Sequence, residues 1–87
     1  MTSVRRTRRR TSHIARDDAI LGGEPIVRGT RIAVRSVVLA AREYGGVSGA
    51  LRAYPHLSRE AAQDALWFYE AHRDEIERYI AENTADD

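Results

Sequence analysis

A glycine-rich segment in the first half of the chain constrains the possible folds more than any other feature. It reads Gly-Gly-Glu-Pro-Ile-Val-Arg-Gly-Thr-Arg-Ile-Ala-Val and spans residues 22–34. Gly22-Gly23 permits a tight turn or a close approach of two backbones, because glycine has no Cβ. Pro25 favours an extended conformation before it, and the β-branched pair Ile26-Val27 fits a half-buried strand. The segment predicts two short extended stretches around a Gly-Thr turn, followed by a helix.

Two arginines, Arg28 and Arg31, flank that turn. They belong either to a recognition strand or to a plain connector whose charges are solvated. Local composition favours neither interpretation over the other.

The residues before the glycines predict the other half of a small ribbon. Residues 13–21 contain aliphatic side chains on both sides of Asp17-Asp18, which indicates a short strand, a turn at the aspartates and a second extended piece. These residues would pair with Ile26-Val27 and Ile32. Because a two-stranded ribbon is only marginally stable alone in water, we expect it to pack on helices or on a second subunit.

The remainder of the chain predicts helices. Apolar residues recur at three- and four-residue steps over residues 34–44, which places them on one face of a first helix: Val34, Val37, Val38, Ala41 and Tyr44. Gly45-Gly46 is expected to end this helix. A short second helix at 49–54 has Ser48 as its expected N-cap and Pro55 as its terminator.

A third helix is expected to open after Ser58, whose hydroxyl can accept a hydrogen bond from the first turn. Trp67 falls at the edge of the apolar stripe of this helix and is followed by Phe68 and Tyr69. An aromatic at such an edge belongs to the core margin more often than to a binding site, although these three could extend onto a partner surface. Residues 74–77 resemble a capping box, so we expect a separate last helix to begin there.

These elements predict a mainly α fold: a homeodomain-like three-helix helix-turn-helix core, preceded by a short β-ribbon and followed by an extra C-terminal helix. We expect a basic arm at 1–12, a single domain at 13–83 and an acidic tail at 84–87. Within the domain, 13–33 is extended and 34–83 is helical. A core of this size is marginal, so self-association is expected.

In such a fold the third helix would enter the major groove of DNA, with Arg59 and Gln63 reading bases and with Arg52 and His56 near phosphates. The charge of that region opposes this prediction. The chain from Glu60 to its end carries nine acidic residues and two arginines. Glu60 and Asp64 would lie beside the very positions that must approach a polyanion. We therefore favour the N-terminal arginines for any contact with nucleic acid.

Charge is divided sharply along the chain. Residues 1–35 carry nine arginines against three acidic residues, a net charge of +6, whereas residues 36–87 carry five against ten, a net charge of −5. The two halves could attract each other, within one chain or across a dimer.

The densest cluster of arginines lies in residues 1–12 and contains Arg5, Arg6, Arg8, Arg9 and Arg10. These residues hold too little apolar surface to fold alone, so we expect an arm that is disordered by itself. An arm that follows phosphates or enters a minor groove is preferred here to a plain solvated tail.

Catalysis, metal binding and membrane insertion find no support in the sequence. There is no cysteine, and His13, His56 and His72 are too far apart for a ligand motif. No nucleophile, base and orienting group come together in one motif, and no apolar run approaches the length of a membrane span. We expect no enzymatic activity, no metal or other cofactor, no small-molecule substrate and no contact with membranes.

The motifs, in their order along the chain, resemble the signature of a bacterial family catalogued as domain of unknown function 433 and described as VapB-like antitoxins. They are the glycine-rich segment within 20–32, the apolar helix at 34–44, the Tyr-Pro-x-Leu sequence at 54–57 and an aromatic cluster ending at Tyr69. The resemblance covers about residues 13–80.

Two positions depart from the family's pattern. Ala33 stands where a proline is common, so the start of the first helix is less sharply fixed. Gly49-Ala50 stands where acidic residues often open the second helix, so we expect that helix to be weak.

The resemblance implies the antitoxin of a type II toxin–antitoxin pair, located in the cytoplasm. The implied partners are a PIN-like (VapC-type) ribonuclease toxin, operator DNA of its own operon and a second copy of the chain in a homodimer. Such toxins hold Mg²⁺ or Mn²⁺ in a cluster of carboxylates, which arginines of this chain would cover. On charge alone, Arg28, Arg31 and Arg35 are the expected toxin-binding residues.

A stand-alone helix-turn-helix transcriptional regulator without a toxin is the main alternative. A structural or RNA-associated adaptor is a third possibility. A neighbouring gene for a small PIN-like protein would favour the antitoxin over the stand-alone regulator, whereas co-purification with ribosomal RNA would indicate the adaptor.

Overall fold

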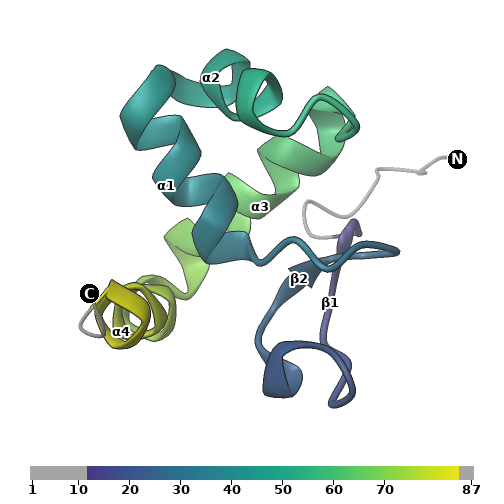
Figure 1. The fold of residues 1–87 in the computed structure, drawn as a ribbon, viewed down its shortest axis with the longest axis vertical. Coiled ribbons are helices and arrows are strands. Elements are labelled where there is room, and N and C mark those ends of the chain that lie inside the picture. Colours follow the sequence, from purple (N-terminus) through teal and green to yellow (C-terminus); the bar gives the residue numbers. More distant parts are fainter. Residues whose placement is uncertain (1–11, 85–87) are drawn as a thin grey trace, which may run out of the picture.

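The structure, a computed structural model, describes residues 12–84 and is mainly helical (Figure 1). The described elements are two strands, one 3-10 turn and four helices: β1 (Ile14–Ala15), η1 (Leu21–Gly23), β2 (Ile26–Val27), α1 (Val34–Tyr44), α2 (Gly46–Ala53), α3 (Arg59–Ala71) and α4 (Arg73–Thr84). The arginine-rich part of the expected arm, 1–11, and the tail residues 85–87 lie outside the described residues.

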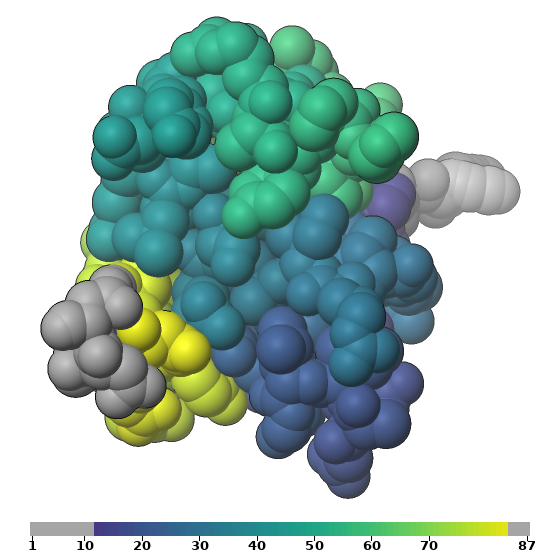
Figure 2. Space-filling model, viewed as in Figure 1, coloured from purple at the N-terminus to yellow at the C-terminus, as the bar shows by residue number. Residues whose placement is uncertain are grey.

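The ribbon predicted from the sequence forms. β1 pairs antiparallel with β2, so that Ile14 faces Val27 and Ala15 faces Ile26. An isolated bridge joins Ile26 to Ala33 on the other side of the Gly-Thr turn. Figure 1 shows this ribbon and α4 on opposite sides of the lower end of α1. Figure 2 shows α1 and α2 covering the upper part of the same face.

The chain between the strands turns instead of extending. The amide of Ala19 donates a hydrogen bond to the Asp17 side chain at 2.9 Å, which confirms the turn at the aspartates. The second extended piece predicted before the glycines is wrong. Leu21–Gly23 has positive φ throughout, from 52° at its first residue to 87° at its last. Glycine adopts such angles without strain, so the glycine pair reverses the chain at this point.

Helix α1 spans the residues predicted for it, but α2 begins earlier than predicted. Gly45 ends α1 in the left-handed conformation, at a φ of 97°, and is also the N-cap of α2, which starts at Gly46. Ser48 therefore lies inside α2, and its predicted capping role is wrong. The two glycines reverse the chain so tightly that no loop is left for Ser48 to cap.

Ser58 caps α3 as predicted, because its Oγ accepts a hydrogen bond from the Ala61 amide at 3.0 Å. Helix α3 ends at Ala71, and α4 starts at Arg73. The predicted break between the last two helices is confirmed. The predicted position of the cap is wrong, since Asp74 lies within the first turn of α4.

Most of the core residues come from α1 and α3, and the ribbon, α2 and α4 add Ile14, Val27, Ala50 and Ile76. Two aromatic residues remain at the surface. Tyr44, which ends the apolar face predicted for α1, is 52% exposed. The chain reverses directly after it, and Gly49 of α2 lies against the backbone and Cβ of Tyr44. Of the three aromatics on α3, Phe68 and Tyr69 are buried, whereas Trp67 is 41% exposed.

Candidate macromolecular interface

A buried carboxylate ties the start of the described chain to α3. Asp64 is fully buried, and its Oδ2 lies 2.6 Å from Nδ1 of His13. The same oxygen accepts hydrogen bonds from the His13 amide at 3.1 Å and from the Ser12 hydroxyl at 3.4 Å. The sequence placed Asp64 beside a DNA-reading surface, and this is wrong, because its carboxylate faces the N-terminal segment. Its spacing gave the signal: Asp64 follows Ala61 by three residues and precedes Phe68 by four, both in the buried stripe.

This contact determines which acidic side chains remain on the outer surface of α3. One of the two acidic residues expected to repel DNA is withdrawn into the core, whereas Glu60 stays exposed. Ser12, the first described residue, lies against Asp64 on α3.

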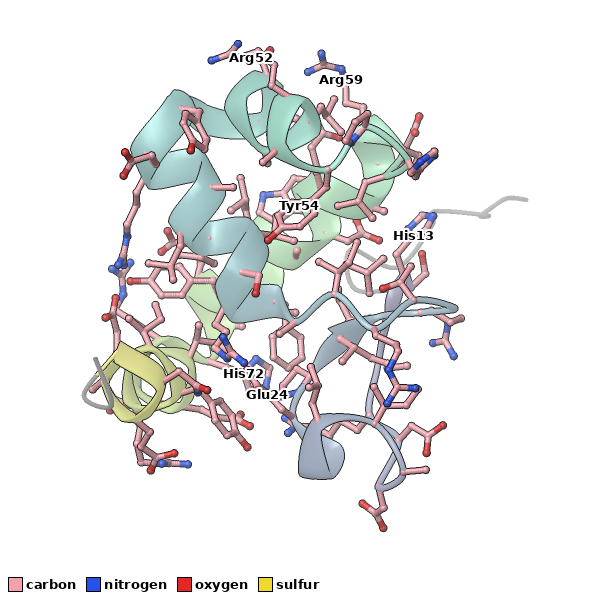
Figure 3. The ribbon with its side chains drawn as sticks, viewed as in Figure 1. His13, Glu24, Arg52, Tyr54, Arg59 and His72 are labelled. Atoms are coloured by element: carbon pink, nitrogen blue, oxygen red, sulfur yellow. The ribbon has the colours of Figure 1, made fainter. Side chains whose placement is uncertain are left out.

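Arg52 and Arg59 lie at the same end of the molecule (Figure 3). They occupy the ends of α2 and α3 that flank the short link at 54–58, and both side chains are exposed. Nη2 of Arg52 donates a hydrogen bond to the carbonyl of Tyr44. Gln63 follows Arg59 by one helical turn and is half-buried. The other members of the predicted nucleic-acid-binding set lie outside the described residues: Arg5, Arg6, Arg8, Arg9 and Arg10.

Arg28, predicted to bind a toxin, holds the ribbon to the N-terminal segment. Its Nε donates to the carbonyl of Ser12 at 3.2 Å, and its Nη2 donates to the carbonyl of Ile14 at 3.0 Å. Its backbone amide bonds the carbonyl of His13 at 2.7 Å. The guanidinium therefore holds the start of β1, and a carboxylate of a partner would have to replace these bonds.

Arg35, the second predicted toxin-binding residue, is paired inside the fold. Its Nε lies 2.6 Å from Oε2 of Glu24, and the two side chains are only 19% and 6% exposed. The atoms are not aligned as a hydrogen-bond donor and acceptor, so the contact is electrostatic. Removing either partner would leave a charge in a mostly buried place, which is strongly unfavourable.

Arg31, the third, is exposed at the tip of the ribbon. The tip is held by Thr30, whose hydroxyl donates to the carbonyl of Val27 at 2.8 Å and accepts from the Ile32 amide at 2.9 Å. Gly29 has a φ of 80°, which this tight turn requires. The turn is thus rigid, and it presents Arg31 to the solvent.

Ion pairs fasten α4, and one of them, between Arg16 and Glu75, joins the basic half of the chain to the acidic half. Arg16 donates to both carboxylate oxygens of Glu75, at 2.6 and 3.1 Å, and this hydrogen bonding lowers the pKa of Glu75. Glu77 accepts hydrogen bonds from the Tyr69 hydroxyl and from Arg42, which lower its pKa in that order of importance. The attraction between the two halves that the sequence allowed therefore occurs within one chain.

Two negative findings apply to the described part of the chain. Over residues 12–84, no group of three or more histidine and carboxylate side chains is arranged to hold a metal ion. Nor is any helix in that range both long enough and apolar enough to cross a lipid bilayer.

Comparison with known proteins decides the family. Residues 14–69 match the family model described as "Protein of unknown function (DUF433)". The chain belongs to this family. A crystal structure of a DUF433 member from Anabaena variabilis is similar to it, with a TM-score of 0.68 and 33% sequence identity. That similarity covers 79% of this chain and 68% of the Anabaena chain. No curated protein matches the sequence. The DUF433 match spans the ribbon and α1 to α3, so these elements form the shared part.

Proposed function

We propose that this DUF433 protein is the antitoxin of a type II toxin–antitoxin pair. It binds and neutralises a PIN-like, VapC-type ribonuclease and represses its own operon by binding operator DNA. Support comes from its glycine-rich and Tyr-Pro-x-Leu motifs, which resemble those of VapB-like antitoxins. The structural observation that carries the proposal is the contact of Asp64 with Ser12 and His13, which fixes the start of the described chain beside α3.

In this proposal, α2 and α3 act as a homeodomain-like helix-turn-helix. Helix α3 enters the major groove with Arg59 and Gln63 at base edges, and Arg52 contacts a phosphate. The burial of Asp64 removes one negative charge from that approach. Glu60 remains exposed on the same helix, so the arginines of the arm at 1–12 supply most of the attraction to the DNA backbone.

Toxin binding falls to Arg31. Arg28 and Arg35 already have partners within the fold, whereas Arg31 projects from a rigid turn. A guanidinium matches a carboxylate with two parallel hydrogen bonds, and such a pair is strong when water is excluded. The tip of the ribbon would therefore enter the carboxylate cluster of the ribonuclease and cover it.

Co-expression with the product of the neighbouring gene tests the toxin-binding role. We expect the wild-type chain to restore growth and to form a stable complex with a PIN-like protein. Arg31→Ala should lose both effects, while Arg78→Ala, which alters an exposed arginine of α4, should keep them. Rescue that is equal in the two variants would remove Arg31 from toxin binding.

The salt dependence of operator binding tests the DNA-binding role. Replacing the five arm arginines with glutamine should flatten the plot of log affinity against log salt concentration, by up to about 0.9 in slope for each phosphate that is no longer neutralised. Arg73→Gln with Arg78→Gln is the control for net charge. An unchanged slope in the arm variant would exclude the arm from DNA binding.

A stand-alone transcriptional regulator is the second candidate. It is favoured by the exposed Arg52 and Arg59, whose placement at one end of the molecule needs no toxin. If the chain binds its operator but forms no complex with the protein product of a neighbouring gene, this alternative is supported over the antitoxin.

A further inference from the structure

An uncovered groove runs between α1 and the end of α2. It encloses about 400 Å³ and is lined by Ser36, Leu39, Ala40, Glu43, Tyr44, Ala53 and Tyr54. A neighbouring hollow of about 390 Å³ shares Tyr44 and Ala53 and adds Arg52. Figure 3 shows Tyr54 on the near side of the molecule beside α1. Neither the ribbon nor α4 covers α1 and α2 on that side (Figure 2).

Tyr44 is a protruding aromatic side chain shared by the groove and the neighbouring hollow. It continues the three- and four-residue spacing of the buried residues of α1, yet its side chain is 52% exposed. The apolar stripe of α1 thus extends beyond the part of this helix that is buried within one chain. Leu39 and Tyr54 in the groove are only partly covered as well. A protruding side chain directly beside a groove is self-complementary, because two copies related by a two-fold axis can each place this side chain in the other's groove.

The charges at the rim fit the same arrangement. Glu43 on α1 lines the groove and Arg52 on α2 lines the neighbouring hollow, and both side chains are exposed; Nη2 of Arg52 also donates a hydrogen bond to the carbonyl of Tyr44. A two-fold axis that exchanges the Tyr44 rings would set Glu43 of one copy opposite Arg52 of the other, twice in each dimer. A partner of single charge would satisfy one of these residues and oppose the other, so the rim favours a second copy over a uniformly charged surface.

We propose that this groove is the interface of a homodimer in which Tyr44 of each copy fills the groove of the other. The inference deepens the proposed function, because a palindromic operator requires two copies of α3. Its argument nevertheless uses only Tyr44, Glu43 and Arg52, so it can fail or hold independently of any toxin.

The mass of the full-length chain in solution, measured by sedimentation across a concentration series, tests the interface. We expect the wild type to be a dimer at micromolar concentrations. Tyr44→Ala should raise the dimer dissociation constant about tenfold or more, as the loss of a central aromatic does. The variant keeps its Cβ and its backbone, which are what α2 contacts, so its circular dichroism should match that of the wild type.

A charge exchange gives the sharper test. Glu43→Arg and Arg52→Glu should each weaken the dimer, and the double variant should restore it, because the opposite charges face each other again. Glu82→Arg, at an exposed position of α4, is the matched control and should leave the dimer unchanged. A monomeric wild type, or a dimer indifferent to all of these changes, overturns the proposal.

The same variants separate this proposal from the proposed function. If Tyr44→Ala weakens the dimer but co-expression gives no rescue of growth, the interface is upheld and the result counts against the antitoxin role. A chain that is monomeric alone but loses its toxin complex on Tyr44→Ala assigns the groove to the toxin and overturns the homodimer.

Discussion

A Cβ on Gly49 would lie 2.3 Å from the carbonyl carbon of Tyr44 and 2.4 Å from its carbonyl oxygen. Helix α2 therefore packs directly on the backbone of the last turn of α1, and position 49 admits no side chain. From the sequence, Gly49 stood out only as a departure from the antitoxin pattern that would weaken the second helix. The structure shows that the glycine allows the two helices to meet.

Gly49→Ala is expected to destabilise the protein. An alanine in a helix interior normally gains about 0.5–1 kcal/mol over glycine. Here the clash with the carbonyl of Tyr44 should reverse the sign and lower the free energy of unfolding by about 1–3 kcal/mol. Urea denaturation measures this change. Ser48→Ala, at an exposed neighbouring position, should shift stability by less than about 0.5 kcal/mol. A more stable Gly49→Ala variant would contradict the close approach.

Asp64→Ala is expected to release the N-terminal segment from α3. The change removes the acceptor of the Ser12 hydroxyl and the His13 amide, and it should cost about 1–3 kcal/mol of unfolding free energy. Hydrogen exchange should show that the His13 amide loses protection while the amides of α1 keep theirs. Glu70→Ala, on the exposed face of α3, is the control. Equal protection of His13 in both variants would show that Asp64 does not hold the segment.

Ala33→Pro is expected to stabilise the protein. Ala33 already has a φ of −73°, the value that proline imposes, and among the described residues its amide donates no backbone hydrogen bond. The substitution should raise the free energy of unfolding by about 0.4–1 kcal/mol, because it restricts the unfolded chain. Thermal unfolding provides the measurement. Ala41→Pro, inside α1, should instead cost about 3 kcal/mol, and a loss of stability in Ala33→Pro would show that the buried position has no room for the ring.

Acid should weaken the attachment of α4 through Glu75. Its pKa is lowered in the folded protein by the hydrogen bonds from Arg16. The pair therefore contributes fully above the unfolded pKa of about 4.3 and loses its contribution as the pH falls through the lower folded pKa. Since Arg16 is 46% exposed, we expect only about 0.2–1 kcal/mol at pH 7.

The stability of Glu75→Gln relative to the wild type, measured from pH 7 to pH 3, checks this prediction. The difference should shrink as the pH falls. Glu82→Gln, whose ion pair with Arg78 joins two exposed side chains 4.0 Å apart, should differ little from the wild type at any pH. A Glu75→Gln deficit that stays constant down to pH 3 would mean that the interaction between Arg16 and Glu75 is not ionic.

Local signals in the sequence determined much of the fold. The spacing of Val34, Val37 and Val38 and the glycine at 45 defined α1 to the residue. The hydroxyl of Ser58 marked the start of α3, and the β-branched pair Ile26-Val27 marked β2. These features depend on interactions within a few residues, such as a cap, a helical face or a turn, so the order of residues suffices to reveal them.

The tertiary structure alone decided which charged and aromatic side chains remain available to a partner. Asp64 meets His13 across 51 residues, Arg35 meets Glu24, and Arg28 crosses β1, so these charges are used within the fold. Tyr44 lies outside the core although its spacing placed it on the apolar face of α1. Each outcome depends on how segments distant in sequence pack together. The spacing of residues along one helix or strand does not indicate which element packs against it.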